Sequence, residues 1–192
     1  MEFHILSGNA KEAILIAGRL SAQAHGYGGL NMRELAAEVG IKAASIYHHF
    51  PSKADLAAAI AERYWQDTKA WLEEVADTES DPKASLRKYP ETFRMSLENG
   101  NRLCLGSFLG AEYDDLPMPV RKQVQTFADV NIAWLKERLV EAGLVGEMES
   151  EARARAIFAA VAGAQLLARS RSDITLFDAM IESYRAAGLI PA

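Results

Sequence analysis

NMRELAAEVGIKAASIYHHFPSK, residues 31–53, contains two short helical patterns separated by a glycine. The first pattern places apolar side chains at the i, i+3, i+4 and i+7 positions of one buried helical face: Met32, Leu35, Ala36 and Val39. Gly40 ends this helix, and a second helix is expected over about residues 42–50, where Pro51 stops it. Two short helices joined by a glycine-containing turn are typical of a helix-turn-helix motif.

The second helix of this motif carries the candidate contacts to DNA. The residues expected to lock the two helices together are Val39, Ile41, Ile46 and Phe50. The residues left on faces that can meet a major groove or its flanking phosphates are Lys42, Ala43, Ala44, Ser45, Tyr47, His48 and His49. Small side chains at positions 43–45 permit close approach to DNA. Lys53 follows at the start of the next helix, where a helix N-terminus and a cation together favour a phosphate.

Almost every other segment has a helical pattern, and no alternating apolar run indicates a β-strand. We therefore predict an all-α fold of about nine helices, with a three-helix helix-turn-helix head over residues 1–52 and a helical bundle over residues 53–192. The helix over 53–76 connects the two, and Ser52 and Asp55 form a capping-box pattern at its start. Pro90 predicts a kink or a break. The expected helices span about 9–25, 32–39, 42–50, 53–75, 83–98, 102–113, 119–142, 150–169 and 175–187.

The composition favours a globular protein with few cations available for DNA. Of the 192 residues, 49% are hydrophobic, and the formal net charge is −5. No run reaches the ~20 apolar residues of a membrane span and Met1–Gly8 lacks a secretion pattern, so we expect a cytoplasmic protein with no membrane partner. Residues 1–65 hold six Lys/Arg and six Asp/Glu, against 15 and 20 in the remainder. Contact with DNA must therefore depend on a few locally placed cations.

The stretch from Ile14 to Ala59 resembles the TetR/AcrR family of transcriptional repressors. The segments that carry the resemblance are an initial helix, GYGGLNMRELAAEVGI and SIYHHFPSKADL. The resemblance implies that residues 42–49 form the recognition helix. It also implies phosphate contacts by Asn31, Arg33, Tyr47 and Lys53. Lys42 stands where Ser or Thr is frequent in the family and Ala44 where Gly is frequent, and these departures concern operator preference.

The same resemblance implies a function and a set of partners. The expected protein is a homodimeric, ligand-responsive regulator, a repressor that binds double-stranded operator DNA with its head. A small-molecule effector would bind the C-terminal ligand-binding and dimerisation bundle and release the DNA. Two other classes stay open: a small helical enzyme, and a protein-interaction module that reuses the head.

CLGSFLGAEYDDLPMPVRKQV, residues 104–124, is similar to a branch of this family in which some members respond to electrophiles or small reactive carbonyl compounds. Cys104 is the only cysteine. It falls within the helix expected over 102–113, where Arg102 and the helix start would favour the thiolate, so it is either a sensor or an inert buried thiol. The aromatic residues that either line an apolar cavity with Cys104 or form packed core are Phe108, Tyr113, Phe127 and Trp134.

No pattern indicates a cofactor, a metal site or a catalytic site. His48 and His49 are neighbours, so their side chains point about 100° apart on a helix, and no further ligand lies nearby in the sequence. Glu112, Asp114 and Asp115 lie at a predicted helix end without a matched base. We expect these carboxylates to form a solvated acidic turn.

The last two predicted helices are amphipathic. Their apolar faces consist of Ile157, Phe158, Val161, Ala164, Gln165 and Ala168 on one helix and of Phe177, Met180, Ile181 and Tyr184 on the other. Small residues at 159, 160 and 162–164 permit close helix approach. These faces fit a two-fold helix bundle between subunits, and packing within one chain is the alternative.

Overall fold

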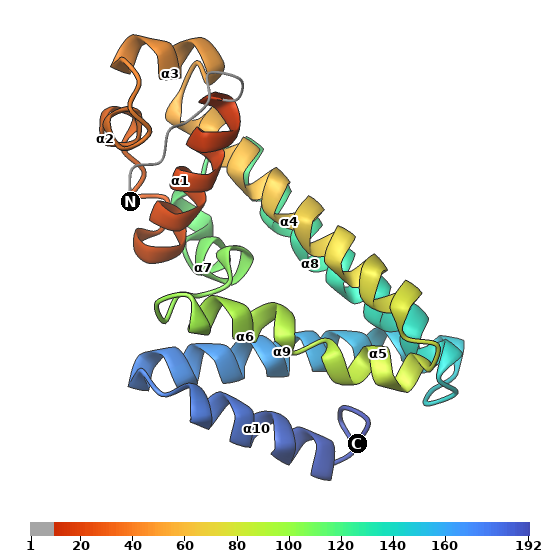
Figure 1. Cartoon of the computed structure of the whole chain (residues 1–192). Helices are drawn as coiled ribbons and strands as arrows, with labels where there is room; N and C mark the ends of the chain where they lie inside the picture. The colour runs from red at the N-terminus through yellow and green to blue at the C-terminus, as the bar shows by residue number, and fades with distance from the viewer. Residues whose placement is uncertain (1–9) are drawn as a thin grey trace. The chain divides into compact units, whose positions relative to one another are not determined.

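The computed structural model describes residues 10–192, which form helices α1 to α10 and one short 3-10 helix, η1 (Figure 1). No β-strand occurs among these described residues, so the predicted all-α fold is confirmed. The elements are α1 Ala10–His25, α2 Met32–Glu38, α3 Ala43–His49, α4 Lys53–Thr78, α5 Pro82–Lys88, α6 Glu91–Glu98, α7 Leu105–Ala111, η1 Tyr113–Asp115, α8 Met118–Glu141, α9 Glu147–Arg171 and α10 Ile174–Ala186.

The predicted break at Pro90 is confirmed, because Tyr89 and Pro90 separate α5 from α6. The helix expected from residue 102 begins later, at Leu105. The reason is the end of α6: Asn101 has a left-handed φ of 54°. The Asn101 and Arg102 amides then donate to Leu97 O and Ser96 O at 2.8 and 2.9 Å. These bonds cap α6 and keep the chain out of a helix until residue 105.

The chain forms two compact units, residues up to 65 with 105–125, and residues 66–104 with 126–192. In the first unit α1 packs against α2, α3 and α7. Gly18 on α1 permits a close approach to α4, because a Cβ built there would lie 2.5 Å from Ile60 Cδ1. Ile14 and Leu56 are fully buried in this core.

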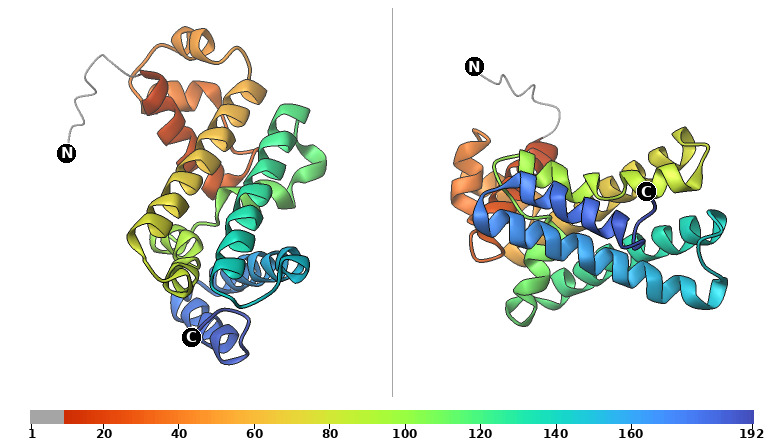
Figure 2. Two further views of the ribbon diagram at one scale, coloured as in Figure 1. Left: turned by 90° about the vertical axis from the view of Figure 1, so that its right-hand side faces the viewer. Right: turned by 90° about the horizontal axis from the view of Figure 1, so that it is seen from below.

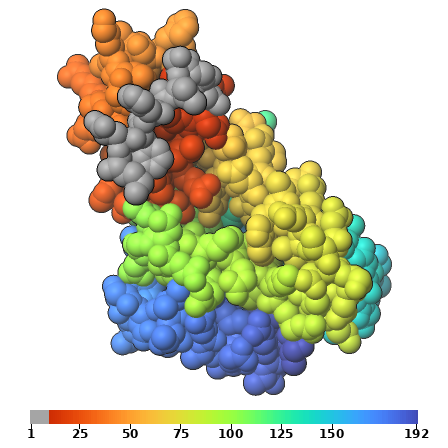
Figure 3. All heavy atoms as spheres, viewed as in Figure 1, coloured from red at the N-terminus to blue at the C-terminus, as the bar shows by residue number. Residues whose placement is uncertain are grey.

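In the second unit α10 folds back along α9, and both helices contact α6 (Figure 2). The space-filling view shows the surface of α5 and α6 meeting the blue surface of α9 and α10 along one seam (Figure 3). Large fully buried side chains such as Tyr89, Phe93 and Phe177 fill this core. Within the described part of the chain, no helix is both long and apolar enough to cross a membrane.

Candidate nucleic-acid interface

Asn31 fixes the start of α2. Its Oδ1 accepts hydrogen bonds from the amides of Arg33 and Glu34 at 3.0 and 3.3 Å, and its Nδ2 donates to Glu34 Oε1 at 2.9 Å. This reciprocal arrangement satisfies two amides at the helix end. Asn31 therefore has a structural role here, and its predicted contact with phosphate stays a prediction. Arg33 is exposed on the first turn of α2.

The turn between α2 and α3 depends on Gly40, whose φ of +74° is a left-handed conformation that glycine adopts without strain. After it, the Ile41 amide donates to Ala36 O at 2.9 Å, which closes the end of α2. Val39 on one side of the turn and Ile46 and Phe50 on the other are buried. The predicted helix-turn-helix thus has an apolar seam between its two helices.

The opposite side of α3 is open to solvent. Lys42, Ala43, Ala44, Tyr47 and His48 are exposed, with Tyr47 retaining 47% of its accessible surface. Ser45 and His49 are half-exposed. The helix therefore has one anchored face and one free face, as an element that enters a groove requires. Among residues 10–192, no group of three or more His, Cys, Asp and Glu side chains is placed to bind a metal ion.

Lys53 is the first residue of α4. Its Nζ lies 4.6 Å from the centre of the Tyr27 ring and donates to Gly28 O at 3.2 Å. The start of α4 is capped as predicted: Ser52 Oγ accepts from the Asp55 amide at 3.1 Å and donates to Asp55 Oδ2 at 2.7 Å. A cation is thus held at the N-terminus of a long helix, where phosphate binding is favoured.

Tyr27 and Glu112 contact each other across a long separation in sequence, and no sequence pattern predicts this pair. The expectation that Glu112 forms part of a solvated acidic turn is wrong. Its Oε2 accepts the Tyr27 amide at 2.7 Å, whereas Asp114 and Asp115 are exposed. A hydrogen bond between residues 85 positions apart leaves no periodic trace in the sequence.

Trp134 and Phe127, two of the predicted effector contacts, are buried in the second unit. The Trp134 indole stacks on the Tyr89 ring at 5.9 Å, and its Nε1 donates to Leu72 O at 2.9 Å. Tyr89 in turn donates its hydroxyl to Asn131 Oδ1 at 3.0 Å. Burial and the neighbouring Cys104 raise the pKa of Tyr89 well above its usual value, so this hydroxyl stays protonated.

Cys104 lies in the coil before α7, so the expectation that it sits on a helix is wrong. It is buried, with 1% of its surface exposed, and its amide donates to Gln165 Oε1 at 3.0 Å. Gln165 Nε2 donates to Phe93 O at 2.6 Å. The Arg102 guanidinium donates to Asn99 O and Asn99 Oδ1 at 2.6 and 3.0 Å, so its charge is directed to the end of α6.

Phe108 and Tyr113 belong to the first unit, unlike the other candidate effector contacts. Arg121 lies 5.0 Å from the centre of the Tyr113 ring, and Gln125 Nε2 donates to the Tyr113 hydroxyl at 2.9 Å. The structure thus gives Tyr113 local partners within the first unit. A common cavity that includes Cys104 stays a prediction.

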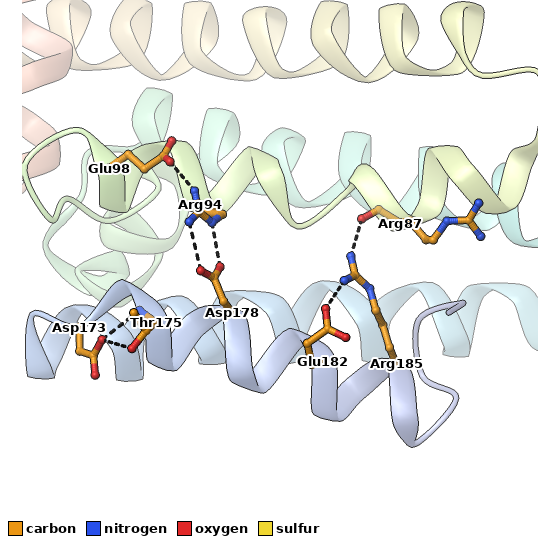
Figure 4. Close-up of polar contacts among 8 residues, drawn as sticks. All are labelled: Arg87, Arg94, Glu98, Asp173, Thr175, Asp178, Glu182 and Arg185. Carbon is orange, nitrogen blue, oxygen red and sulfur yellow. Dashed lines mark hydrogen bonds and ion pairs between the residues drawn. The ribbon is translucent and has the colours of Figure 1, made fainter.

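Two open hollows lie along the seam between α6 and α10. Their volumes are about 420 and 190 Å³. Arg94 lines both, and its guanidinium binds Asp178 at 2.8 and 3.1 Å and also Glu98 (Figure 4). These contacts raise the pKa of Arg94, chiefly through the hydrogen bonds to Asp178. The hollows are bordered by paired charges and so differ from the apolar cavity that was one of the two interpretations of the aromatic residues.

The apolar face of α9 that was predicted to lie between subunits packs within the chain. Ile157, Val161 and Gln165 are buried, so internal packing, the stated alternative, describes this face. Another face of α9 is left open. It carries Leu166 and Leu167, exposed by 57% and 39%, and Gly163, where an added Cβ would meet no atom within 4 Å.

Known proteins resemble this chain in sequence over the head and in fold over most of its length. Residues 14–60 match the profile of bacterial regulatory proteins of the tetR family. A TetR transcriptional regulator from Legionella pneumophila superposes with a TM-score of 0.87 and 29% identity, covering 93% of this chain and 97% of that chain. A TetR-family transcriptional regulator from Agrobacterium tumefaciens gives 0.82 and 29%, covering 90% and 93%.

A likeness in fold alone extends to FadR, a transcriptional regulator from Bacillus subtilis solved in complex with stearoyl-CoA. The TM-score is 0.72 and the identity 15%, over 94% of this chain and 97% of that chain. No curated protein matches the chain.

Proposed function

We propose that the chain is a regulator of the TetR family, whose profile residues 14–60 match, and that it represses transcription by binding operator DNA and leaves that DNA when a small molecule binds. The observation that carries the proposal is the two-sided character of α3. Ile46 anchors the helix, while Lys42, Ala43, Ala44 and Tyr47 remain exposed. The proposal assigns no catalytic step, and it places the protein in the cytoplasm, where operator DNA is found.

In the proposed complex α3 enters the major groove. Ala43 and Ala44 allow the helix backbone to approach the base edges, and His48 can donate to a base or to a phosphate. Tyr47 and Lys53 contact phosphates on either side of the groove. Because the first 65 residues carry equal numbers of cations and anions, binding relies on these few side chains.

We propose that two copies pair through the open face of α9. Leu166 and Leu167 supply exposed apolar surface, and Gly163 permits close approach of a second helix. A dimer places two recognition helices about one DNA turn apart, roughly 34 Å, on a two-fold symmetric site. A small movement of either helix then costs affinity at both half-sites.

The effector is proposed to bind in the second unit. FadR, which shares the fold, binds stearoyl-CoA, so helical bundles of this kind can hold a small molecule. The candidate wall of such a site is a series of ring contacts that runs from Trp134 through Tyr89, Phe93 and Phe158 to Phe127. Cys104 neighbours Tyr89 in this series. In the covalent form of this proposal, the effector is an electrophile that modifies Cys104.

The test begins with purified protein and a pool of random duplex DNA. Repeated selection should enrich a two-fold symmetric sequence, and binding to it should be at least about a thousandfold tighter than to scrambled duplex at the same salt concentration. Enrichment of no sequence, or equal affinity for the selected and scrambled duplexes, would remove the proposed function. Small-molecule screens would then score release of the selected duplex.

A further inference from the structure

The turn between α1 and α2, residues 26–29, is held by a side chain from much later in the chain. The Tyr27 amide donates to Glu112 Oε2 at 2.7 Å. Glu112 lies between α7 and η1, in the 105–125 segment that packs in the same compact unit as the helix-turn-helix. This hydrogen bond therefore joins the helix-turn-helix head to residues 105–125, which lie far from the head in the sequence.

The carboxylate fits directly against the backbone of this turn. Gly26 has a φ of +69°, and a Cβ built on it would lie 2.2 to 2.5 Å from the carboxylate atoms of Glu112. No side chain can occupy that space while Glu112 is there. A charged acceptor bound to a backbone amide is also among the stronger hydrogen bonds in proteins. The turn and the carboxylate are thus complementary in shape and in hydrogen bonding.

The same turn also contacts Lys53. The Tyr27 ring lies 4.6 Å from Lys53 Nζ, and Gly28 O accepts from Nζ at 3.2 Å. Both contacts restrict the ammonium group at the start of α4, where the proposed function has it binding a phosphate. Tyr27 therefore contacts both residues: its backbone amide binds Glu112, and its ring lies against Lys53.

We propose that Glu112 is a positioning residue for DNA binding, which holds the 26–29 turn and through Tyr27 sets the place of Lys53. The inference rests on the proposed function. The segment that carries Glu112 continues into α8, whose later residues belong to the second unit. A change of that unit that displaces residues 105–125 would withdraw the carboxylate from the turn, and the loss of DNA affinity would follow.

The test compares Glu112→Ala with the matched control Asp115→Ala, which removes an exposed carboxylate three residues away. The first readout is hydrogen exchange of the Tyr27 amide in the free protein, measured by NMR. Exchange should become about tenfold faster or more in Glu112→Ala and stay unchanged in the control. Glu112→Gln retains an oxygen that can accept the amide and should restore most of the protection.

The second readout is binding to the duplex that the wild type selects. Glu112→Ala should weaken binding about tenfold and reduce the slope of log K against log salt by about 0.9, the contribution of one phosphate. Lys53→Ala should do the same, and the double variant should lose little more than either single variant. A variant that is merely less stable would not change the salt slope.

The outcomes separate the two proposals. If the wild type selects no sequence, the proposed function fails and this inference fails with it. If the wild type binds its selected duplex and Glu112→Ala keeps both its affinity and its salt slope although the Tyr27 amide is exposed, only the inference is overturned. Should Glu112→Ala not melt cooperatively, Glu112→Asp, which keeps the charge but shortens the reach, provides the same comparison.

Discussion

Gly26 and Gly28 lie two residues apart in one turn but meet different constraints. Gly26 has a positive φ and no space for a Cβ, whereas a Cβ on Gly28 would meet no atom within 4 Å. We expect Gly26→Ala to lower the free energy of unfolding by at least about 1–2 kcal/mol, the usual cost of a left-handed alanine. Gly28→Ala, the control, should change it by less than about 1 kcal/mol. Urea denaturation measures both, and equal effects would contradict the described turn.

Tyr47 and Lys53 make different contributions to the proposed phosphate contacts. Lys53→Ala should reduce the salt slope of DNA binding by about 0.9. Tyr47→Phe, which removes only the hydroxyl, should weaken binding by about 1 kcal/mol, roughly fivefold in Kd, without changing the slope. Lys69→Ala on the exposed surface of α4 is the control. Fluorescence anisotropy at several salt concentrations measures these effects, and an unchanged slope in Lys53→Ala would place the phosphate contact elsewhere.

Cys104 has only 1% of its surface exposed. Because a thiol must reach the reagent to react, we expect labelling by a disulfide reagent to be at least about a hundredfold slower in the native protein than in urea. If Cys104 is a sensor, the labelled wild type should release its duplex while Cys104→Ser, treated alike, stays bound. Equal behaviour of the two proteins would leave the thiol with a packing role.

At the scale of elements, the helix ends that were predicted correctly are those that one residue, or a pair close in sequence, determines. Pro90, Gly40 and the Ser52–Asp55 box each act through their own backbone or a near neighbour, and all three predictions are confirmed. The start of α7 was predicted three residues too early. The bonds that cap α6 require a left-handed backbone at Asn101, and an asparagine in the sequence does not by itself predict that conformation.

The exposed faces were harder to predict than the helix ends. Gln165 is polar but fully buried, since its amide group bridges Cys104 and Phe93 backbone atoms. Conversely, Leu166 is apolar but exposed. Periodicity shows that α9 has two kinds of face, but it does not show which one the rest of the chain covers. The Glu112–Tyr27 contact was unpredictable for a related reason, because it depends on tertiary structure alone.

The N-terminus of α10 provides a pH-dependent test at this scale. Asp173 accepts hydrogen bonds from the Thr175 hydroxyl and amide at 2.6 and 2.9 Å, and these bonds lower its pKa. The stabilisation is therefore present above the unfolded-state pKa of about 3.9 and is lost as the pH falls through the lower folded value. Asp173→Asn keeps a capping oxygen without this titration.

We expect the stability difference between wild type and Asp173→Asn to favour the wild type at pH 7 and to shrink or reverse near pH 3. Urea denaturation of both proteins at each pH measures this difference, and other titrating groups cancel in the comparison. A difference that stays constant across this range would show that the carboxylate of Asp173 does not cap α10 in solution.

At the scale of the whole molecule, binding to a two-fold symmetric operator requires two chains. The open face of α9 is the proposed contact, and Gly163 offers a precise way to test it. Since an added Cβ there meets no atom of the same chain, a side chain at this position is compatible with the fold of one subunit. The same side chain would lie between the helices of a dimer and prevent their close approach.

Gly163→Glu should therefore convert the dimer to a single chain of 21.0 kDa while leaving its helical content and cooperative melting intact. Light scattering measures the mass, and anisotropy should show at least about a hundredfold loss of affinity for the selected duplex, because each half-site then binds alone. Ala133→Glu adds the same charge at an exposed position of α8 and should remain a dimer with full affinity. A Gly163→Glu protein that stays dimeric would move the interface away from this face of α9, and the spacing of the recognition helices would then have to be set by another surface.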